Sequence, residues 1–253
     1  HGNAFAKIKM KLWRRLLAET YGTAALTFVI FASHGNAFAV GIGFWVIIVG
    51  TGFIGGAHFN PAVTLGALVK EWWFTRTFEK NFLKEHLLYF LCQIIGALFG
   101  ALLGTLISGG HFYVHVPTGE TNLEAYLAEA AFTGHLVLVV LVTSAVLDST
   151  IAAGMAIAFT VLAGIRTVGH ISGGCFNPTV CIAIDAVQAI RYSDEPTNYL
   201  DSVPVYLLGP LIGVVVGVGL AIIFLTERNE KNESVLKEDG HVDAGLFSIK
   251  KAK

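Results

Sequence analysis

The chain has 253 residues, of which 54% are hydrophobic and 14% are charged, and its formal net charge is −1. Soluble globular domains carry about 25% charged residues, so this composition excludes an ordinary soluble domain and favours a membrane protein. The cysteines are odd in number, three, and lack metal-ligand spacing, so neither a disulfide framework nor a metal site is expected. No cofactor and no nucleic-acid partner are expected, and no nucleophile and base are arranged as in an enzyme.

Apolar stretches of spanning length recur along the chain. A bilayer core of about 30 Å requires roughly 20 mostly apolar residues per helix. Six stretches approach this length: residues 15–33, 38–54, 83–107, 123–147, 151–165 and 203–226. Two shorter segments, 61–69 and 178–190, follow the second and fifth stretches and are candidate re-entrant segments. The predicted fold is an all-α membrane protein with six transmembrane helices and two re-entrant half-helices.

Lysine and arginine gather before the first stretch, between residues 70 and 84, and after Thr226. The positive-inside rule then places both termini in the cytoplasm. Six spans are consistent with this placement, because an even number puts both termini on the same side. Residues 1–11 are predicted to form a cytoplasmic segment and residues 12–226 the membrane domain. The polar residues 227–253 are predicted to be a disordered cytoplasmic tail.

The membrane domain reads as an inverted repeat with halves of about 12–107 and 123–226. Ala18-Glu19 in the first half corresponds to Ala128-Glu129 in the second. Each half holds three stretches, an odd number, so the second half must lie inverted in the bilayer. Repeats of this kind build their functional site near the midplane from broken helices.

The two short segments begin alike, with Asn60-Pro61-Ala62 and Asn177-Pro178-Thr179. Asparagine is a preferred N-cap and proline a preferred first helical residue, so each motif predicts a helix start. One Asn-Pro pair alone is usually a turn. Two pairs, each after a Gly-Gly loop and each at the start of a half-span, predict two half-helices that meet N-terminus to N-terminus at a pore centre.

The loops before these motifs contain glycines at positions 55, 56, 173 and 174, which are expected to let the chain run extended. Irregular backbone is tolerated in a bilayer where it lines a wet cavity. The carbonyl groups expected to line it are those of Gly56, Ala57, His58, Gly173 and Cys175. Two helix N-termini that face one point repel cations and protons but accept a small neutral molecule.

Residues 56–66, Gly-Ala-His-Phe-Asn-Pro-Ala-Val-Thr-Leu-Gly, closely match a motif of the aquaporin (major intrinsic protein) family, and the sequence resembles that family over residues 12–226. The resemblance implies a passive channel for water or small uncharged solutes, with one pore per protomer in a homotetramer embedded in membrane lipids. Glu19 and Glu129 fall within spans, where ionisable side chains face the bundle interior. We interpret both as structural braces that accept hydrogen bonds from the re-entrant loops.

Members of the family generally carry a constriction of aromatic and arginine side chains on the extracellular side. By offset from the two asparagines, its four positions here are Val40, Ile165, Gly174 and Val180, and arginine is expected at position 180. Loss of its donors and positive charge relaxes selection by size and charge. Three readings stay open: a channel for water, glycerol, urea or ammonia; a poorly conducting member with a structural or adhesive role; and a pore with some ion leak.

Overall fold

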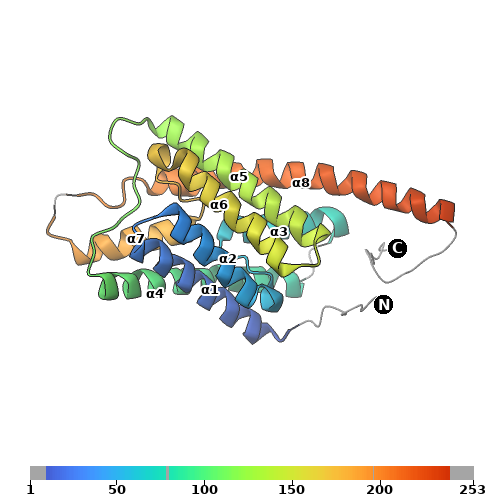
Figure 1. Cartoon of the computed structure of the whole chain (residues 1–253), viewed down its shortest axis with the longest axis horizontal. Helices are drawn as coiled ribbons and strands as arrows, with labels where there is room; N and C mark the ends of the chain where they lie inside the picture. Colours follow the sequence, from blue (N-terminus) through green and yellow to red (C-terminus); the bar gives the residue numbers. More distant parts are fainter. Residues whose placement is uncertain (1–9, 78–79, 196, 240–253) are drawn as a thin grey trace.

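Long apolar helices, as the sequence pattern predicted, make up most of the chain. The computed structural model describes residues 10–77, 80–195 and 197–239, with 227–239 described by backbone alone. Within these ranges it is a bundle of helices (Figure 1). In chain order they are α1 (Leu12–Ala32), α2 (Ala37–Gly55), α3 (Pro61–Thr75), α4 (Lys80–Ser108), α5 (Asn122–Val146), α6 (Thr150–Ser172), α7 (Pro178–Arg191) and α8 (Val203–Asp239).

Five of the described helices are long and apolar enough to cross a membrane: α2, α4, α5, α6 and α8 up to Thr226. The first predicted span, α1, has the length of a span but is more polar. Its polar residues Glu19, Thr23 and Thr27 are fully buried, because the polar face of α1 turns into the bundle rather than outward. The Thr23 and Thr27 hydroxyls donate to backbone carbonyls one turn earlier, both at 2.8 Å.

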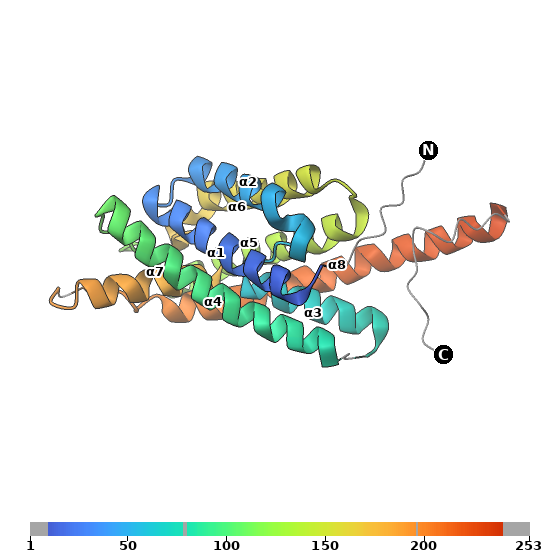
Figure 2. The ribbon, with the colours of Figure 1, turned by 90° about the horizontal axis from the view of Figure 1, so that it is seen from below.

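The packing of the helices follows the inverted repeat. In the first half α1 packs against α4 and α2, and in the second half α5 packs against α8 and α6. The half-helices cross between the halves, since α3 packs against α8 and α7 packs against α4 (Figure 2). The pore motifs are therefore held jointly by both halves.

Glycines bring the main helix pairs into close contact. A Cβ atom at Gly96 or Gly100 of α4 would overlap backbone carbonyl oxygens of α1, and one at Gly217 of α8 would overlap the carbonyl oxygen of Gly134 in α5. Small residues at four-residue spacing allow such backbone contact between membrane helices.

Several helix ends differ from the expectations, and α3 in particular continues to Thr75, beyond the predicted end at residue 69. The loops do not run extended at their glycines: Gly55 is the last residue of α2, and Gly56 and Gly173 adopt left-handed conformations that end α2 and α6. A left-handed residue after the last turn is a common helix stop that glycine adopts without strain. Helix α6 consequently runs beyond the predicted end at Ile165.

Helix α8 continues to Asp239, into residues 227–239 that were expected to be disordered. Glutamate, lysine and leucine in this segment favour helix, and a helix already formed extends at low cost. The remainder of the predicted tail, 240–253, and most of the predicted N-terminal segment, 1–9, lie outside the described residues.

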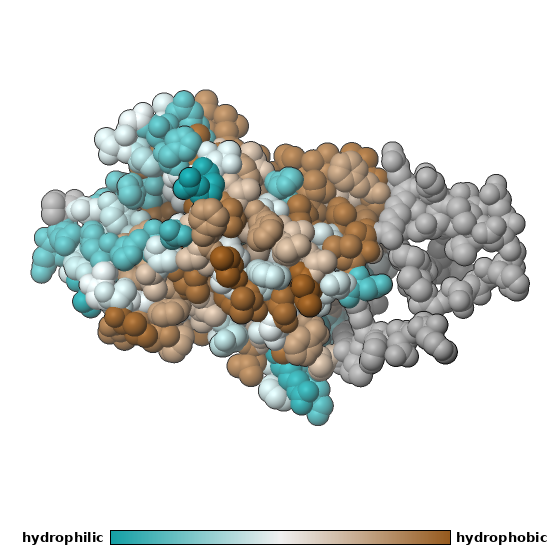
Figure 3. Space-filling model, viewed as in Figure 1, coloured by the Kyte–Doolittle hydropathy of each residue, from teal (hydrophilic) through white to brown (hydrophobic). Residues whose placement is uncertain are grey.

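Large apolar side chains cover the outside of the bundle, including Leu17, Phe53, Ile107 and Val215, each more than half exposed. Figure 3 shows this apolar surface over the middle of one face, with hydrophilic residues gathered at the end away from the chain termini. A surface of this kind suits contact with lipid or with neighbouring subunits rather than with water.

Candidate functional site

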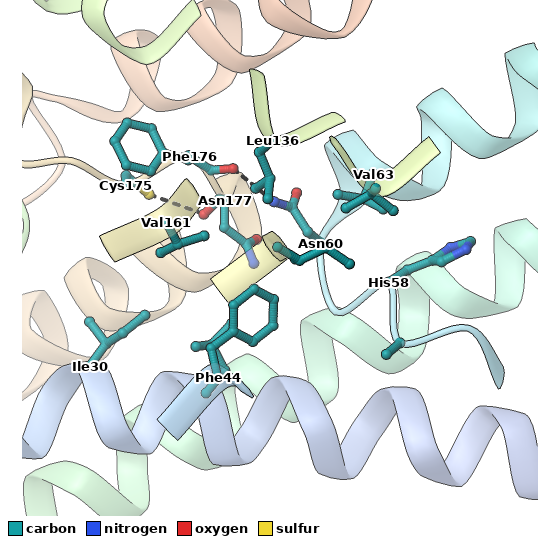
Figure 4. Close-up of a pocket in the computed structure, with 14 residues that line it drawn as sticks. Ile30, Phe44, His58, Asn60, Val63, Leu136, Val161, Cys175, Phe176 and Asn177 are labelled. Carbon is teal, nitrogen blue, oxygen red and sulfur yellow. Dashed lines mark hydrogen bonds between the residues drawn. The ribbon is translucent and has the colours of Figure 1, made fainter. Parts of the chain in front are cut away.

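The two asparagines of the paired motifs meet at the centre of the bundle. The Asn60 Nδ2 atom donates to the carbonyl oxygen of Phe176 at 2.7 Å, and the Asn177 Nδ2 atom donates to the carbonyl oxygen of Phe59 at 2.8 Å. Each asparagine thus bonds the loop of the opposite half, and their side chains lie close together (Figure 4). An amide nitrogen carries two hydrogens, so one on each asparagine is left for another acceptor.

Both asparagines lie at helix starts, with Pro61 and Pro178 as the first helical residues. The Asn60 Oδ1 atom accepts the Ala62 N–H at 2.8 Å, which caps α3. The cap of α7 differs: Asn177 Oδ1 is buried and has no hydrogen-bond partner among the described residues. Two helix N-termini, each worth roughly half a positive charge, therefore converge on one point.

A buried glutamate holds each loop from behind. The two Glu19 oxygens accept the N–H groups of His58 at 2.9 Å and Phe59 at 2.8 Å, and Gln93 adds a third bond at 2.9 Å. The two Glu129 oxygens accept the N–H groups of Cys175 at 2.9 Å and Phe176 at 2.7 Å.

The braced backbone is strained. Ala57, Phe59 and Phe176 have positive φ values of 53°, 48° and 55°. Such conformations cost about 1–3 kcal/mol each for residues other than glycine and persist where surrounding bonds enforce them. The glutamates supply those bonds, because they bind the N–H groups of Phe59 and Phe176.

A narrow cavity runs past the asparagine pair. Its volume, taken as the space open to the centre of a water molecule, is about 20 Å³. Its walls are mainly apolar side chains, among them Phe44, Val63 and Val161. Asn60, Asn177 and His58 supply its polar lining. One water needs roughly 10–15 Å³ measured in this way, so this cavity has room for about one molecule at a time.

A second cavity of about 40 Å³ lies next to the first, since Ile30, Val161 and Cys175 line both. We call the first the lower cavity and the second the upper cavity. The two cavities therefore adjoin beside the loop that precedes α7. No charged side chain lines either of them in the described part of the chain.

The structure places the predicted constriction residues in two groups. Val40, Ile165 and Gly174 line the upper cavity, as Cys181 also does. Val180 is fully buried, as Val40 also is, but it does not line this cavity. Among the residues with predicted pore-lining carbonyls, Ala57, His58, Gly173 and Cys175 border a cavity, whereas Gly56 borders neither.

His58 lines the lower cavity and also contacts the neighbouring side chains of His86 and Tyr89. Its Nδ1 atom lies 3.2 Å from the Thr64 hydroxyl, and its ring contacts those of His86 and Tyr89. Tyr89 donates to the carbonyl of Gly55 at 3.1 Å. The Tyr89 hydroxyl also bonds Glu85, and Glu85 pairs with Arg15.

Phe112 and Val114 line the upper cavity from the segment between α4 and α5, and neither was predicted to do so. This segment has no regular secondary structure and was expected to be only a connecting loop. Its alternation of apolar Phe112, Val114 and Val116 with His111, Tyr113 and His115 is the period-two pattern of an extended chain with one buried side. That pattern was the available signal.

The cysteines also differ from the expectation. Cys175 and Cys181 are joined as a disulfide, with Cα atoms 6.2 Å apart, whereas the odd count of three had predicted none. One cysteine lies in the loop before Asn177 and the other in the first turns of α7, so the fold brings together two thiols that sequence spacing did not pair.

We expect mercurials to block conduction of the reduced protein, because Cys175 borders both cavities and a bound mercury atom would fill a path one molecule wide. The oxidised protein should resist, since its disulfide offers no thiol. Water flux measured with and without prior reduction checks this. Cys92→Ser is the matched control and should leave the block intact, because Cys92 lies on α4 and lines neither cavity. Undiminished flux in reduced, mercurial-treated protein would contradict the expectation.

Comparisons with known proteins agree with this architecture. The family model described as "Major intrinsic protein" matches residues 6–224. The chain is 30% identical over 236 residues to aquaporin NIP1-1 of Zea mays, a match that covers 85% of this chain and 76% of that protein. It is 29% identical over 256 residues to aquaporin AqpM of Methanothermobacter marburgensis, covering 87% of this chain and all of that protein.

Among solved structures, the X-ray structure of the aquaglyceroporin from Plasmodium falciparum superposes with a TM-score of 0.67 at 21% identity, covering 83% of this chain and 95% of that chain. At this identity the match shows the fold. The family model spans both halves of the repeat and both asparagine motifs, and the fold places these motifs at the centre of a cavity path. The chain therefore belongs to the major intrinsic protein family.

Proposed function

We propose that the protein is a passive channel for water and small uncharged solutes, with its path through the lower and upper cavities. The observation that carries this is the crossed pair of bonds from Asn60 and Asn177, 2.7 and 2.8 Å long, at the meeting point of two helix N-termini. A neutral molecule with an oxygen acceptor gains hydrogen bonds there. A cation or hydronium ion meets two partial positive charges and no carboxylate lining.

Glu19 and Glu129 act as structural braces rather than proton carriers. Both are completely buried, and each accepts bonds from two loop N–H groups. Neither lines a cavity, so neither contacts the permeating molecule. Their role is to fix the loop conformation that positions the asparagines.

Selectivity is set in the upper cavity, at Val40, Ile165 and Gly174. The residue at the position of the family arginine is Val180, which lines neither cavity. An uncharged, largely apolar constriction offers solutes few hydrogen bonds. It therefore favours solutes larger or less polar than water over strongly hydrated solutes, because an apolar wall cannot replace the hydrogen bonds of a hydration shell.

The protein assembles as a homotetramer with both termini in the cytoplasm. Family resemblance supports the tetramer, and the apolar outer faces of α1, α2, α4 and α8 are suited to subunit contacts. The start of α1 and the end of α8 lie at one end of the bundle (Figure 1), and the lysine and arginine residues cluster near those segments. Light scattering of the detergent-solubilised protein would measure the assembly size.

Osmotic stopped-flow measurements on proteoliposomes test the channel. Gradients of sucrose, glycerol, urea and ammonia, each against empty liposomes, should show flux of water and at least one other neutral solute. A proton-leak assay should show none above background. Absence of any flux would favour a structural or adhesive role, and a conductance that scales with voltage would favour an ion pore.

A matched pair of variants tests the barrier at the pore centre. Asn177→Asp places a carboxylate beside the lower cavity and is expected to admit protons or cations that the parent protein excludes. Asn122→Asp makes the same change at the exposed first residue of α5 and should leave the proton leak at background. Equal leak from the two variants would contradict the proposed electrostatic barrier.

A further inference from the structure

The segment between α4 and α5, residues 109–121, lies across one end of the bundle, and we call it the strap. Three of its backbone N–H groups, on alternate residues, donate to side chains of the α7–α8 region. The bonds are Phe112 to Gln188 Oε1 at 3.4 Å, Val114 to Asp185 Oδ1 at 2.8 Å and Val116 to Ser202 Oγ at 3.0 Å. A segment without regular secondary structure is thereby held at three successive points.

Asp185 is the central anchor of the strap. Its side chain is completely buried, and its bond to the Val114 N–H is the shortest of the three. The other carboxyl oxygen, Oδ2, has no hydrogen-bond partner among the described residues. Among the described residues the bond to the strap is the one hydrogen bond that the Asp185 side chain makes, whereas Gln188 also donates to Thr105 at 3.1 Å.

The side of the strap that faces the bundle lines the upper cavity. Phe112 and Val114 line the upper cavity together with Val40, Ile165 and Gly174. Val114 is only 6% exposed, and its Cγ1 atom lies 2.8 Å from the point where a Cβ on Gly173 would stand. The strap therefore packs directly on the re-entrant loop of the second half.

The other side of the strap contacts the loop before α8 through a hydrogen bond. His111 Nε2 lies 2.5 Å from the Tyr199 hydroxyl, which donates to Glu195 at 2.7 Å. Burial and the neighbouring Glu195 carboxylate raise the pKa of Tyr199 to about 12, so the hydroxyl keeps its proton. The rings of Tyr113 and His115 stack on this side with centroids 4.6 Å apart.

We propose that Asp185 is a positioning residue that holds Phe112 and Val114 of the strap in the wall of the upper cavity, and that these two side chains limit the size of the solute that passes. This rests on the proposed channel function. The strap supplies part of the wall of the upper cavity beside Val40, Ile165 and Gly174, whereas Val180 supplies none. Selection by size then depends on a segment that can move when one buried hydrogen bond is lost.

The experiment measures glycerol and water permeability of the full chain in proteoliposomes. Asp185→Ala removes the acceptor of the Val114 N–H, and the ratio of glycerol to water permeability should rise about fivefold, the change in population expected when one net hydrogen bond is lost. Asp185→Asn keeps an acceptor oxygen at the same place and should restore a ratio close to that of the parent protein. A purely structural role for Asp185 would change yield or stability but not this ratio.

Two further variants keep the proposal testable if Asp185→Ala fails to fold. Phe112→Ala removes a side chain from the cavity wall and should raise the same ratio, while His115→Ala, on the exposed side of the strap, should leave it unchanged. If Phe112→Ala conducts water with an unchanged ratio of glycerol to water permeability, the strap proposal is overturned and the proposed channel function stands. No flux in the parent protein would instead overturn the channel function.

Discussion

Replacement of Glu129 by alanine is expected to abolish folding of the second re-entrant loop and, with it, all flux. Three donors lose the Glu129 acceptor, two of them buried and one partly buried: the Ser172 hydroxyl at 2.7 Å and the N–H groups of Phe176 at 2.7 Å and Cys175 at 2.9 Å. Each unsatisfied donor costs about 1–3 kcal/mol, so the total approaches the whole stability of a typical domain. The left-handed conformation of Phe176 also loses the bond that enforces it.

Yield of monodisperse protein, the midpoint of thermal unfolding in detergent and water flux measure this effect. Glu129→Gln keeps one acceptor oxygen and should fall between the alanine variant and the parent protein. Glu71→Ala, the same change at an exposed position on α3, is the control and should resemble the parent protein. Matching midpoints and fluxes for the two alanine variants would rule out the brace.

Gly217→Leu is expected to prevent assembly of the second half. A Cβ at this position would overlap the carbonyl oxygen of Gly134 and lie 3.0 Å from the Cβ of Val137, so a leucine side chain would force α8 away from α5. Overpacking usually costs 1–3 kcal/mol, and a backbone clash that no rotamer can relieve should exceed about 4 kcal/mol. We expect aggregated protein or none.

Gly219→Leu offers a matched control on the same helix, because nothing lies within 4 Å of a Cβ built at that position. It should retain the yield, unfolding midpoint and flux of the parent protein. Size-exclusion profiles of the two variants, expressed side by side, make the comparison. A monodisperse, conducting Gly217→Leu protein would show that the close contact between α5 and α8 is not required.

The main features of the architecture were readable from the chain. Spanning helices follow from apolar length, and the starts of α3 and α7 follow from Asn-Pro, because the cap and the fixed φ of proline are local effects. Repeat symmetry also indicated that Glu19 and Glu129 have equivalent surroundings. Their hydrogen-bond partners could only be surmised, since Phe59 and Phe176 lie 40 and 47 residues away along the chain.

Helix ends were less predictable. Gly56 and Gly173 could equally serve an extended segment or a left-handed helix stop, and the tertiary structure selects the stop by binding the next N–H groups to the glutamates. The continuation of α8 past Thr226 shows the converse case, in which local propensity outweighs the polarity that had suggested disorder.

The sequence by itself determined the membrane class, the inverted repeat and the asparagine pair at the pore centre, because these depend on composition and on local helix-start chemistry. Which side chains border the upper cavity depends on the tertiary structure. It left Val180 outside the cavity lining, paired Cys175 with Cys181 and brought Phe112 and Val114 to the upper cavity. The bond between Val114 and Asp185 joins residues 71 positions apart, and no local pattern encodes which distant segment packs there.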